Sequence, residues 1–262
     1  MKMSAPIGVF DSGLGGLTAL RQLQKELPSE DFIYFGDTAR VPYGGRDHDT
    51  LLEFARGDIA LLQEYGVKAI LVACGTVSSV ILEEIKSDYS IPLVGVIESA
   101  AEAAARATRN GCVGIWGTEA SIRSGAYAAK LQALGYENTV AVACPKLVPL
   151  IEGGGDAREA VAEYLAPVLA AGADTLILGC THYPLLKGVI AEQSPALKLV
   201  DSGAESCLSL RYALEERNLL RRYHEGTTRY LVSGNPADFE LRGGRFLAQD
   251  LKGKVEQQNA GK

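Results

Sequence analysis

Two cysteines occupy matching places in a pair of similar segments. Residues 69–76 (AILVACGT) and 175–182 (TLILGCTH) are each an apolar run that ends in a cysteine and a polar cluster. The cysteines are Cys74 and Cys180, and the step between them is 180 − 74 = 106 residues. A glycine precedes each run at the same step. The sequence therefore predicts two matching buried strands, each ending in a thiol.

Paired thiols indicate acid–base chemistry on two sides of one substrate. Each cysteine leaves its strand for a turn and a helix, where backbone amides favour the thiolate and lower the pKa from about 8.5. A single nucleophilic cysteine needs one base and an oxyanion hole, and it has no use for a second thiol. Inversion of a carbon centre needs a base on one face and an acid on the other. The pair Cys74 and Cys180 therefore predicts a racemase or an epimerase.

Polar neighbours could assist both thiols. Asp11 ends the strand at residues 7–10 and could orient or receive a proton near Cys74. His182 follows Cys180 by two residues and could serve it, or it could simply bond loop backbone. Four hydroxyl side chains could bind substrate carboxylates, and any of them could equally be a plain helix cap: Ser12, Thr76, Thr118 and Thr181. Glu152 has the pattern of an ordinary exposed carboxylate at a helix end.

The other cysteines and the glycine-rich turn need no special chemistry. Cys112, Cys144 and Cys207 are expected to be buried small hydrophobes. Five cysteines are an odd and sparse count for this length, and they show neither Cys-x-x-Cys spacing nor zinc-type histidine partners. Disulfides are therefore not expected, and a reducing cytoplasm is expected. The turn after residue 12 matches neither the dinucleotide pattern nor the phosphate loop. Nothing in the sequence requires a metal or an organic cofactor.

Composition narrows the class of protein further. The chain has 262 residues, 47% of them hydrophobic, so it can bury a sizeable core in one large domain or two ordinary ones. Its formal charge of −6 gives no reason to expect nucleic acid or an anionic membrane as a partner. No apolar run approaches the roughly 20 residues of a membrane helix. The first strand follows the N-terminus so closely that no signal peptide is expected.

Strand and helix patterns alternate without hairpin signals, which predicts parallel sheets with helices on both faces. The step of 106 recurs, because residues 113–118 fall on 7–12 and residues 199–200 fall on 93–94. We therefore expect an α/β fold of two pseudo-symmetric parallel-sheet domains, with the active site in the cleft between them.

The predicted first domain covers residues 1–98 and 207–262, and the second covers 99–206. A helix is expected to end near residue 86, before a strand at 92–97. Further along the chain, a helix at about 204–217, a strand at 229–232 and a last helix at about 236–248 are expected. The C-terminal part of the chain should pack back on the first domain. Residues 252–262 should be polar and frayed.

Several longer stretches resemble the glutamate racemases of the cofactor-independent aspartate/glutamate racemase superfamily. The matching stretches are GVFDSGLGGL from Gly8, GDT from Gly36, PYG from Pro42, ACGT from Ala73, GVIE from Gly95, ACP from Ala143, VPLIE from Val148 and LGCTHYPLL from Leu178. They span most of the chain.

The resemblance implies roles for these residues. Cys74 and Cys180 would be the two catalytic bases, assisted by Asp11, Glu152 and His182. The substrate pocket would contain Asp11, Ser12, Pro42, Tyr43, Gly44, Gly75, Thr76, Thr118, Thr181 and His182. The family is cofactor-independent, supplies D-glutamate for bacterial cell-wall precursors and is usually a homodimer.

The main departure from the family is at Gly75, and a smaller one is the Ser99 and Ala100 that follow Glu98, where the family often has proline and glycine. The family reads Cys-Asn-Thr where this chain has Cys74, Gly75 and Thr76, and the lost amide removes a polar contact worth about 1 kcal/mol, or up to ~3 kcal/mol where a buried partner is left unsatisfied. A same-fold racemase of aspartate or another small diacid is therefore an alternative. A third reading is a non-catalytic two-lobed binder of acidic metabolites. The paired cysteines argue against the binder, which needs no bases.

Overall fold

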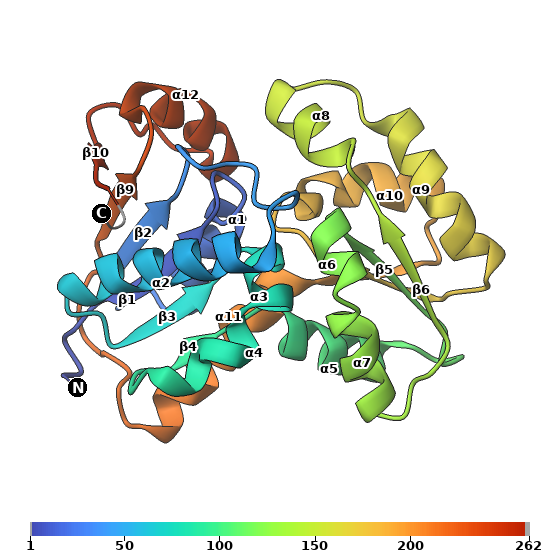
Figure 1. Cartoon of the computed structure of the whole chain (residues 1–262), viewed down its shortest axis with the longest axis horizontal. Helices are drawn as coiled ribbons and strands as arrows, with labels where there is room; N and C mark the ends of the chain where they lie inside the picture. Colours follow the sequence, from blue (N-terminus) through green and yellow to red (C-terminus); the bar gives the residue numbers. More distant parts are fainter. Residues whose placement is uncertain (1, 260–262) are drawn as a thin grey trace.

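The protein contains two parallel β-sheets. The computed structural model describes residues 2–259. The larger sheet has the order β10-β9-β2-β1-β3-β4, and the smaller has the order β6-β5-β7-β8 (Figure 1). The larger sheet comprises β1 (Ile7–Asp11), β2 (Phe32–Gly36), β3 (Ala69–Val72), β4 (Leu93–Val94), β9 (Thr228–Val232) and β10 (Val255–Gln257). The smaller sheet comprises β5 (Val113–Gly117), β6 (Thr139–Ala143), β7 (Thr175–Leu178) and β8 (Lys198–Asp201).

The two sheets repeat one arrangement of strands. The order β2-β1-β3-β4 recurs as β6-β5-β7-β8, and every pairing is parallel. Ile7 is paired with Ala69 in the larger sheet, and Val113 is paired with Thr175 in the smaller. These pairs are related by the 106-residue step read from the sequence. The predicted α/β fold with two similar parallel-sheet halves is confirmed.

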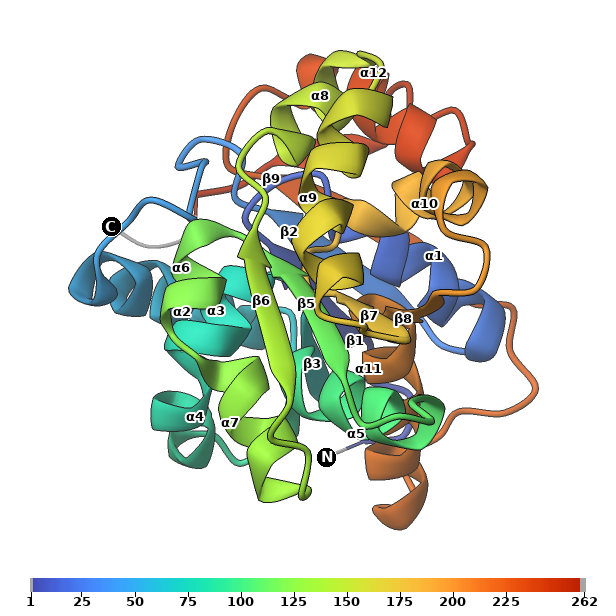
Figure 2. The same cartoon turned by 90° about the vertical axis from the view of Figure 1, so that its right-hand side faces the viewer.

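Helices cover both faces of each sheet, and strands β1, β3, β5 and β7 are therefore buried along their whole length. Around the larger sheet lie α1 (Leu17–Glu26), α2 (His48–Glu64), α3 (Gly75–Val80), α4 (Leu82–Ile85), η1 (Lys86–Asp88) and α12 (Pro236–Leu247). The smaller sheet, which faces the viewer in Figure 2, is flanked by α6 (Glu119–Arg123), α7 (Ala126–Ala133), α8 (Leu147–Gly153), α9 (Arg158–Ala170), η2 (Tyr183–Leu186) and α10 (Lys187–Gln193).

Two helices join the halves. These are α5 (Ile97–Ala107) and α11 (Ser202–Glu216), which pack against each other. The second of them also contacts β3 and β4 of the larger sheet and β8 of the smaller. Because α11 belongs to both packing layers, the domain limits at 98/99 and 206/207 stay a prediction.

The C-terminal part of the chain packs on the first half, as predicted. Strand β9 lies between β2 and β10, and α12 contacts α1. The prediction that residues 252–262 are frayed is wrong for Val255–Gln257, which pair with β9; residues 260–262 lie outside the described residues. The expected strand at 92–97 is also shorter, because α5 already begins at Ile97.

Within residues 2–259, no helix combines the length and the apolar character needed to cross a membrane.

Candidate active site

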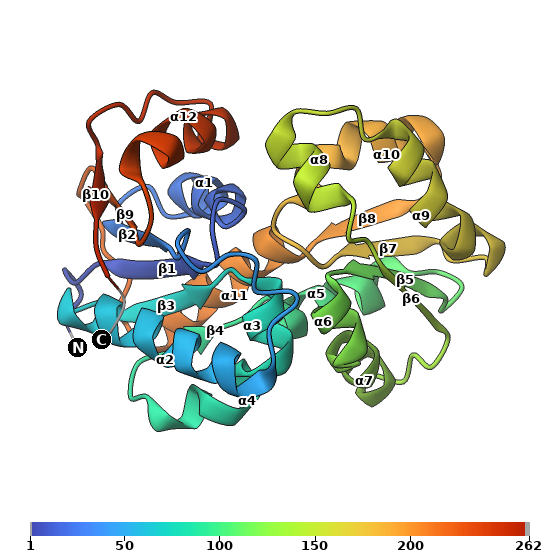
Figure 3. The same ribbon diagram turned by 45° about the horizontal axis from the view of Figure 1, so that its top comes forward.

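A cleft of about 510 Å³ lies where the two lobes meet, at the carboxyl ends of their strands. Every residue that the sequence predicted for the site lines it. The lobes face each other across this region in Figure 3. Its walls are therefore built by segments far apart in the chain: the loops after β1, β2 and β3 on one side, and those after β5, β6 and β7 on the other.

Cys74 forms part of the wall that the larger sheet supplies. It follows β3, caps the start of α3 and is buried. Burial raises the pKa of its thiol to about 12, and the negative charge of Asp11 adds to this effect. The amides of Ser12 and Val77 act in the opposite direction but are outweighed. The prediction of a lowered pKa at this cysteine is therefore wrong, because desolvation exceeds the effect of the amides.

Asp11 lies behind Cys74 at the end of β1. Its carboxylate accepts a 2.9 Å hydrogen bond from the amide of Gly13, and a 3.5 Å contact joins it to the hydroxyl of Thr181 in the other lobe. Burial raises the pKa of this carboxyl group, while the charge of His182 lowers it. Asp11 is thus a buried carboxyl group that adjoins both walls.

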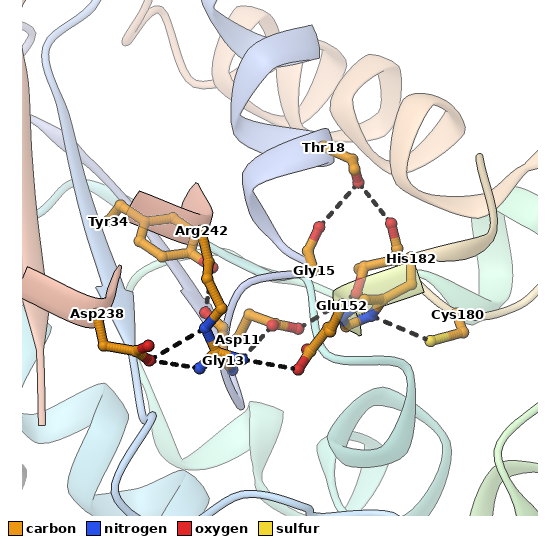
Figure 4. Close-up of polar contacts among 11 residues, drawn as sticks. Asp11, Gly13, Gly15, Thr18, Tyr34, Glu152, Cys180, His182, Asp238 and Arg242 are labelled. Atoms are coloured by element: carbon orange, nitrogen blue, oxygen red, sulfur yellow. Dashed lines mark hydrogen bonds and ion pairs between the residues drawn. The ribbon is translucent and has the colours of Figure 1, made fainter. Parts of the chain in front are cut away.

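Cys180 lies on the opposite wall, next to His182, which in turn contacts Glu152. Its Sγ lies 3.7 Å from Nδ1 of His182, and Nε2 of that ring lies 2.8 Å from Oε1 of Glu152 (Figure 4). Burial lowers the pKa of His182, but its contacts with Cys180 and Glu152 raise it more, to about 10. The imidazole is therefore protonated at neutral pH. Glu152 is not the ordinary exposed carboxylate that its sequence context indicated, because its side chain is only 28% exposed and pairs with this ring.

The predicted hydroxyls connect the lobes. Thr76 and Thr118 place their Oγ1 atoms 3.1 Å apart across the cleft. Thr118 also caps α6, because its Oγ1 accepts a hydrogen bond from the amide of Ser121. The prediction that it could be a helix cap is therefore confirmed as well. Thr18 donates a 2.7 Å hydrogen bond to the carbonyl of Thr181, which fixes the chain just before His182.

The loop after β2 brings Pro42, Tyr43 and Gly44 to the rim of the cleft. The Tyr43 hydroxyl turns into the protein, where it hydrogen-bonds to the buried carboxyl groups of Asp37 and Asp58. Tyr43 therefore anchors the loop through its hydroxyl, while its neighbours line the cleft.

At Gly75 the backbone of one lobe lies close to the backbone of the other. A Cβ atom built on it would lie 2.5 Å from the carbonyl oxygen of Gly179. Real Cβ contacts essentially never reach such a distance, and the neighbour is backbone rather than a flexible side chain. A glycine is therefore required here for this closeness of the lobes.

Sequence reasoning missed an apolar part of the lining. It comprises Val41, Cys144, Pro145, Val148, Pro149 and Tyr183. Cys144 is buried, as predicted, but it also faces the cleft. Its position beside Pro145 in one of the family-like stretches was a usable signal. Among the described residues that line the cleft there is no lysine or arginine, so hydroxyls, amides and His182 are the groups that can meet an anion.

Comparisons with known proteins agree with this architecture. The family model described as Asp/Glu/Hydantoin racemase matches residues 18–207. A glutamate racemase of Geobacter metallireducens is 46% identical over 252 residues, which cover 94% of this chain and 93% of that protein.

Two solved structures are similar over nearly the whole chain. Glutamate racemase from Thermus thermophilus, in complex with beta-chloro-D-alanine, has a TM-score of 0.89 at 42% identity and covers 99% of this chain and 98% of its own. The enzyme from Francisella tularensis, in complex with D-glutamate, has a TM-score of 0.88 at 33% identity with the same coverage. The chain therefore belongs to the Asp/Glu/Hydantoin racemase family, and it is an amino-acid racemase.

Proposed function

We propose that this protein is a glutamate racemase that uses Cys74 and Cys180 as its two bases and needs no cofactor. The observation that carries this proposal is the placement of two buried thiols on opposite walls of one cleft, each with its own polar partner. The names of the similar proteins support glutamate as the substrate. The polar groups of the cleft suit a small dicarboxylate.

The reaction is a proton transfer through a planar carbanion. One thiolate removes the Cα proton of glutamate, the electron pair of the C–H bond stays on Cα, and the thiol on the other wall donates its proton to the opposite face. The thiol and the thiolate have then exchanged roles, so the opposite enantiomer can react in the reverse sense.

The two sulfurs have different surroundings before L- or D-glutamate binds. The raised pKa of Cys74 favours its protonated thiol. The imidazolium of His182 lies 3.7 Å from the sulfur of Cys180, where it can stabilise negative charge that forms there during proton transfer. In this proposal the charge of Asp11 favours the protonated thiol of Cys74, and Glu152 orients the His182 ring through its hydrogen bond.

Incubation with L-glutamate or D-glutamate in D2O tests the proposal. We expect loss of optical signal from both enantiomers, with deuterium at Cα, and no change after treatment with EDTA. Cys74→Ser and Cys180→Ser should each lower kcat by about 100-fold or more, because each removes one acid–base group. Cys112→Ser is the control, since this buried cysteine does not line the cleft.

The other outcomes distinguish the alternatives. Exchange at Cα of aspartate but not of glutamate would make the protein an aspartate racemase. Binding of an acidic amino acid without any exchange would make it a binder.

We further propose a cellular role in the supply of D-glutamate for peptidoglycan, in the cytoplasm and as a homodimer. The family resemblance supports the role and the dimer, and five free cysteines suit a reducing compartment. Rescue of a depleted strain by external D-glutamate would test the role, and sedimentation would test the dimer.

A further inference from the structure

Helix α12 of the first lobe contacts the second lobe next to the Cys180 wall. Arg242 of α12 donates a hydrogen bond of 3.3 Å from Nη1 to Oε2 of Glu152 in α8. Its Nε and Nη2 donate to Oδ2 of Asp238, one turn earlier in α12, at 3.0 and 2.6 Å (Figure 4). The guanidinium group is thus fixed by its own helix and presented to a carboxylate of the other lobe.

Glu152 divides its two oxygens between the lobes. Oε2 accepts from Arg242, and Oε1 lies 2.8 Å from Nε2 of His182. The other nitrogen of the ring, Nδ1, lies 3.7 Å from the sulfur of Cys180. One continuous chain of polar contacts therefore runs from α12 to the sulfur.

The same helix also packs against the histidine ring. Phe246 of α12 meets His182 edge-to-face, with ring centroids 5.6 Å apart and planes at 89°. On the other side, a Cβ atom at Gly15 would lie 2.4 Å from Nδ1 of His182, so the backbone of this turn abuts the ring. The first lobe therefore encloses a histidine that belongs to the second lobe.

We propose that Arg242 is a positioning residue for the Cys180 half of the reaction. It holds Glu152 in the orientation that keeps the His182 ring directed at Cys180, and it does so only while α12 lies against α8. Arg242 itself does not line the cleft, so it acts through Glu152 and not on the substrate. Within residues 2–259, the Cys74 wall has no equivalent of Arg242, because α12 belongs to the C-terminal part of the chain, which has no partner in the 106-residue repeat.

The charges around His182 come from several elements. The groups that face it are Cys180 on its own loop, Glu152 on α8, Asp11 at the end of β1 and, through Glu152, Arg242 and Asp238 on α12. Burial raises the pKa of Glu152, but the hydrogen bond and the charge of His182 lower it more, and the charge of Arg242 adds a smaller lowering. The contact with Glu152 in turn raises the pKa of His182. Loss of Arg242 is therefore expected to change both titrations.

The kinetic test compares Arg242→Gln with Arg245→Gln, which removes the same charge from an exposed position three residues later in α12. This inference rests on the proposed function. We expect Arg242→Gln to lower kcat about tenfold with KM changed less than about threefold, because misplaced catalytic groups lose rate rather than substrate affinity. The acidic limb of the kcat/KM profile should move to higher pH, because the pKa of Glu152 rises when the positive charge of Arg242 is lost. Arg242→Lys should recover most of kcat.

A second background separates positioning from general damage to the fold. In a Glu152→Gln protein, the further change Arg242→Gln should have little additional effect on kcat, since its route to His182 is already cut. An equal loss of kcat in both backgrounds would overturn the proposal. So would an Arg242→Gln protein with the kinetics and pH profile of Arg245→Gln.

A spectroscopic readout does not depend on which substrate is turned over. The chain has 3 histidines, so the imidazole ¹⁵N signals can be assigned with His182→Gln. We expect His182 to titrate near pH 10 in the wild-type protein and at lower pH in Arg242→Gln, because the fixed Glu152 contact is one of the causes of the raised pKa. An unchanged His182 titration would refute the positioning role, even if glutamate proves to be the wrong substrate.

Discussion

The two cysteines are equivalent in the sequence but not in their surroundings. Cys74 is buried beside Asp11, which favours the thiol, whereas Cys180 lies beside a charged imidazole. A racemase must begin each turnover with one base and one acid. The two walls therefore give the two sulfurs different electrostatic surroundings.

Gly75 shows that a missing side chain can be a structural requirement. The sequence suggested that its family-typical asparagine had been lost as a substrate contact. The structure shows instead that a Cβ atom there would collide with the carbonyl of Gly179. We therefore expect Gly75→Asn to lower kcat/KM for glutamate about tenfold, because the lobes must part to admit it and such overpacking costs about 1–3 kcal/mol.

The matched pair Gly75→Ala and Gly188→Ala isolates the Cβ atom. Gly188 in α10 has open space at this position, so its alanine variant should keep full activity. Steady-state kinetics on all three variants checks the expectation. A rise in kcat/KM in Gly75→Asn would restore the view that the amide is simply a lost contact.

At the scale of elements, the loop after β2 depends on a buried polar cluster. The two carboxyl groups of Asp37 and Asp58 share the hydroxyl of Tyr43 and the guanidinium of Arg40. Burial and the neighbouring carboxylate raise the pKa of Asp58 well above its usual range. The cluster therefore fixes the loop through hydrogen bonds to carboxyl groups that are buried away from water.

We expect Tyr43→Phe to destabilise the protein by about 1–3 kcal/mol, because two fully buried carboxyl groups lose a donor. KM for glutamate should rise more than kcat falls, since the loop lines the cleft but carries neither thiol. Urea unfolding and steady-state kinetics measure the two effects. Tyr212→Phe is the control, because this tyrosine is 63% exposed and should stay within about 0.5 kcal/mol. Equal stability of the two variants would exclude the anchoring role.

At the scale of the whole molecule, groups buried between the lobes make stability depend on pH. The pKa of His182 is raised from 6.5 to about 10, because its contacts outweigh burial, and burial raises the pKa of Cys74 from 9.0 to about 12. A pKa that is raised on folding means that the unfolded chain releases its proton first as the pH increases. This contribution to stability is complete below pH 6.5 and is lost as the pH rises through the folded values.

The free energy of unfolding should therefore be lower at pH 10 than at pH 6.5, the two values between which His182 titrates in the unfolded and folded states. Urea unfolding under reducing conditions measures it. In His182→Gln the decrease should be smaller, because the contribution of this histidine is then absent. A wild-type protein that is equally stable at both values would show that the His182 contacts do not persist in solution.

Much of the fold was determined by the sequence alone. The alternation of strands and helices predicted parallel sheets, and the 106-residue step predicted two similar halves, because strand type and repeat length are local properties of the chain. The grouping of Asp11, Cys74, Cys180 and His182 also followed, since the carboxyl ends of parallel strands meet at one edge. What such patterns miss are short elements in polar segments, such as β10, whose pairing with β9 depends on a distant partner.

Only the tertiary structure decided how the two walls differ. Desolvation of Cys74, the collision that makes Gly75 necessary, and the reach of Arg242 to Glu152 all depend on the distance between lobes that are far apart in the chain. Burial and electrostatic interactions vary steeply with distance, so no spacing in the sequence fixes them. The sequence thus determined which groups meet in the cleft, and the packing of the lobes determined their charge and orientation.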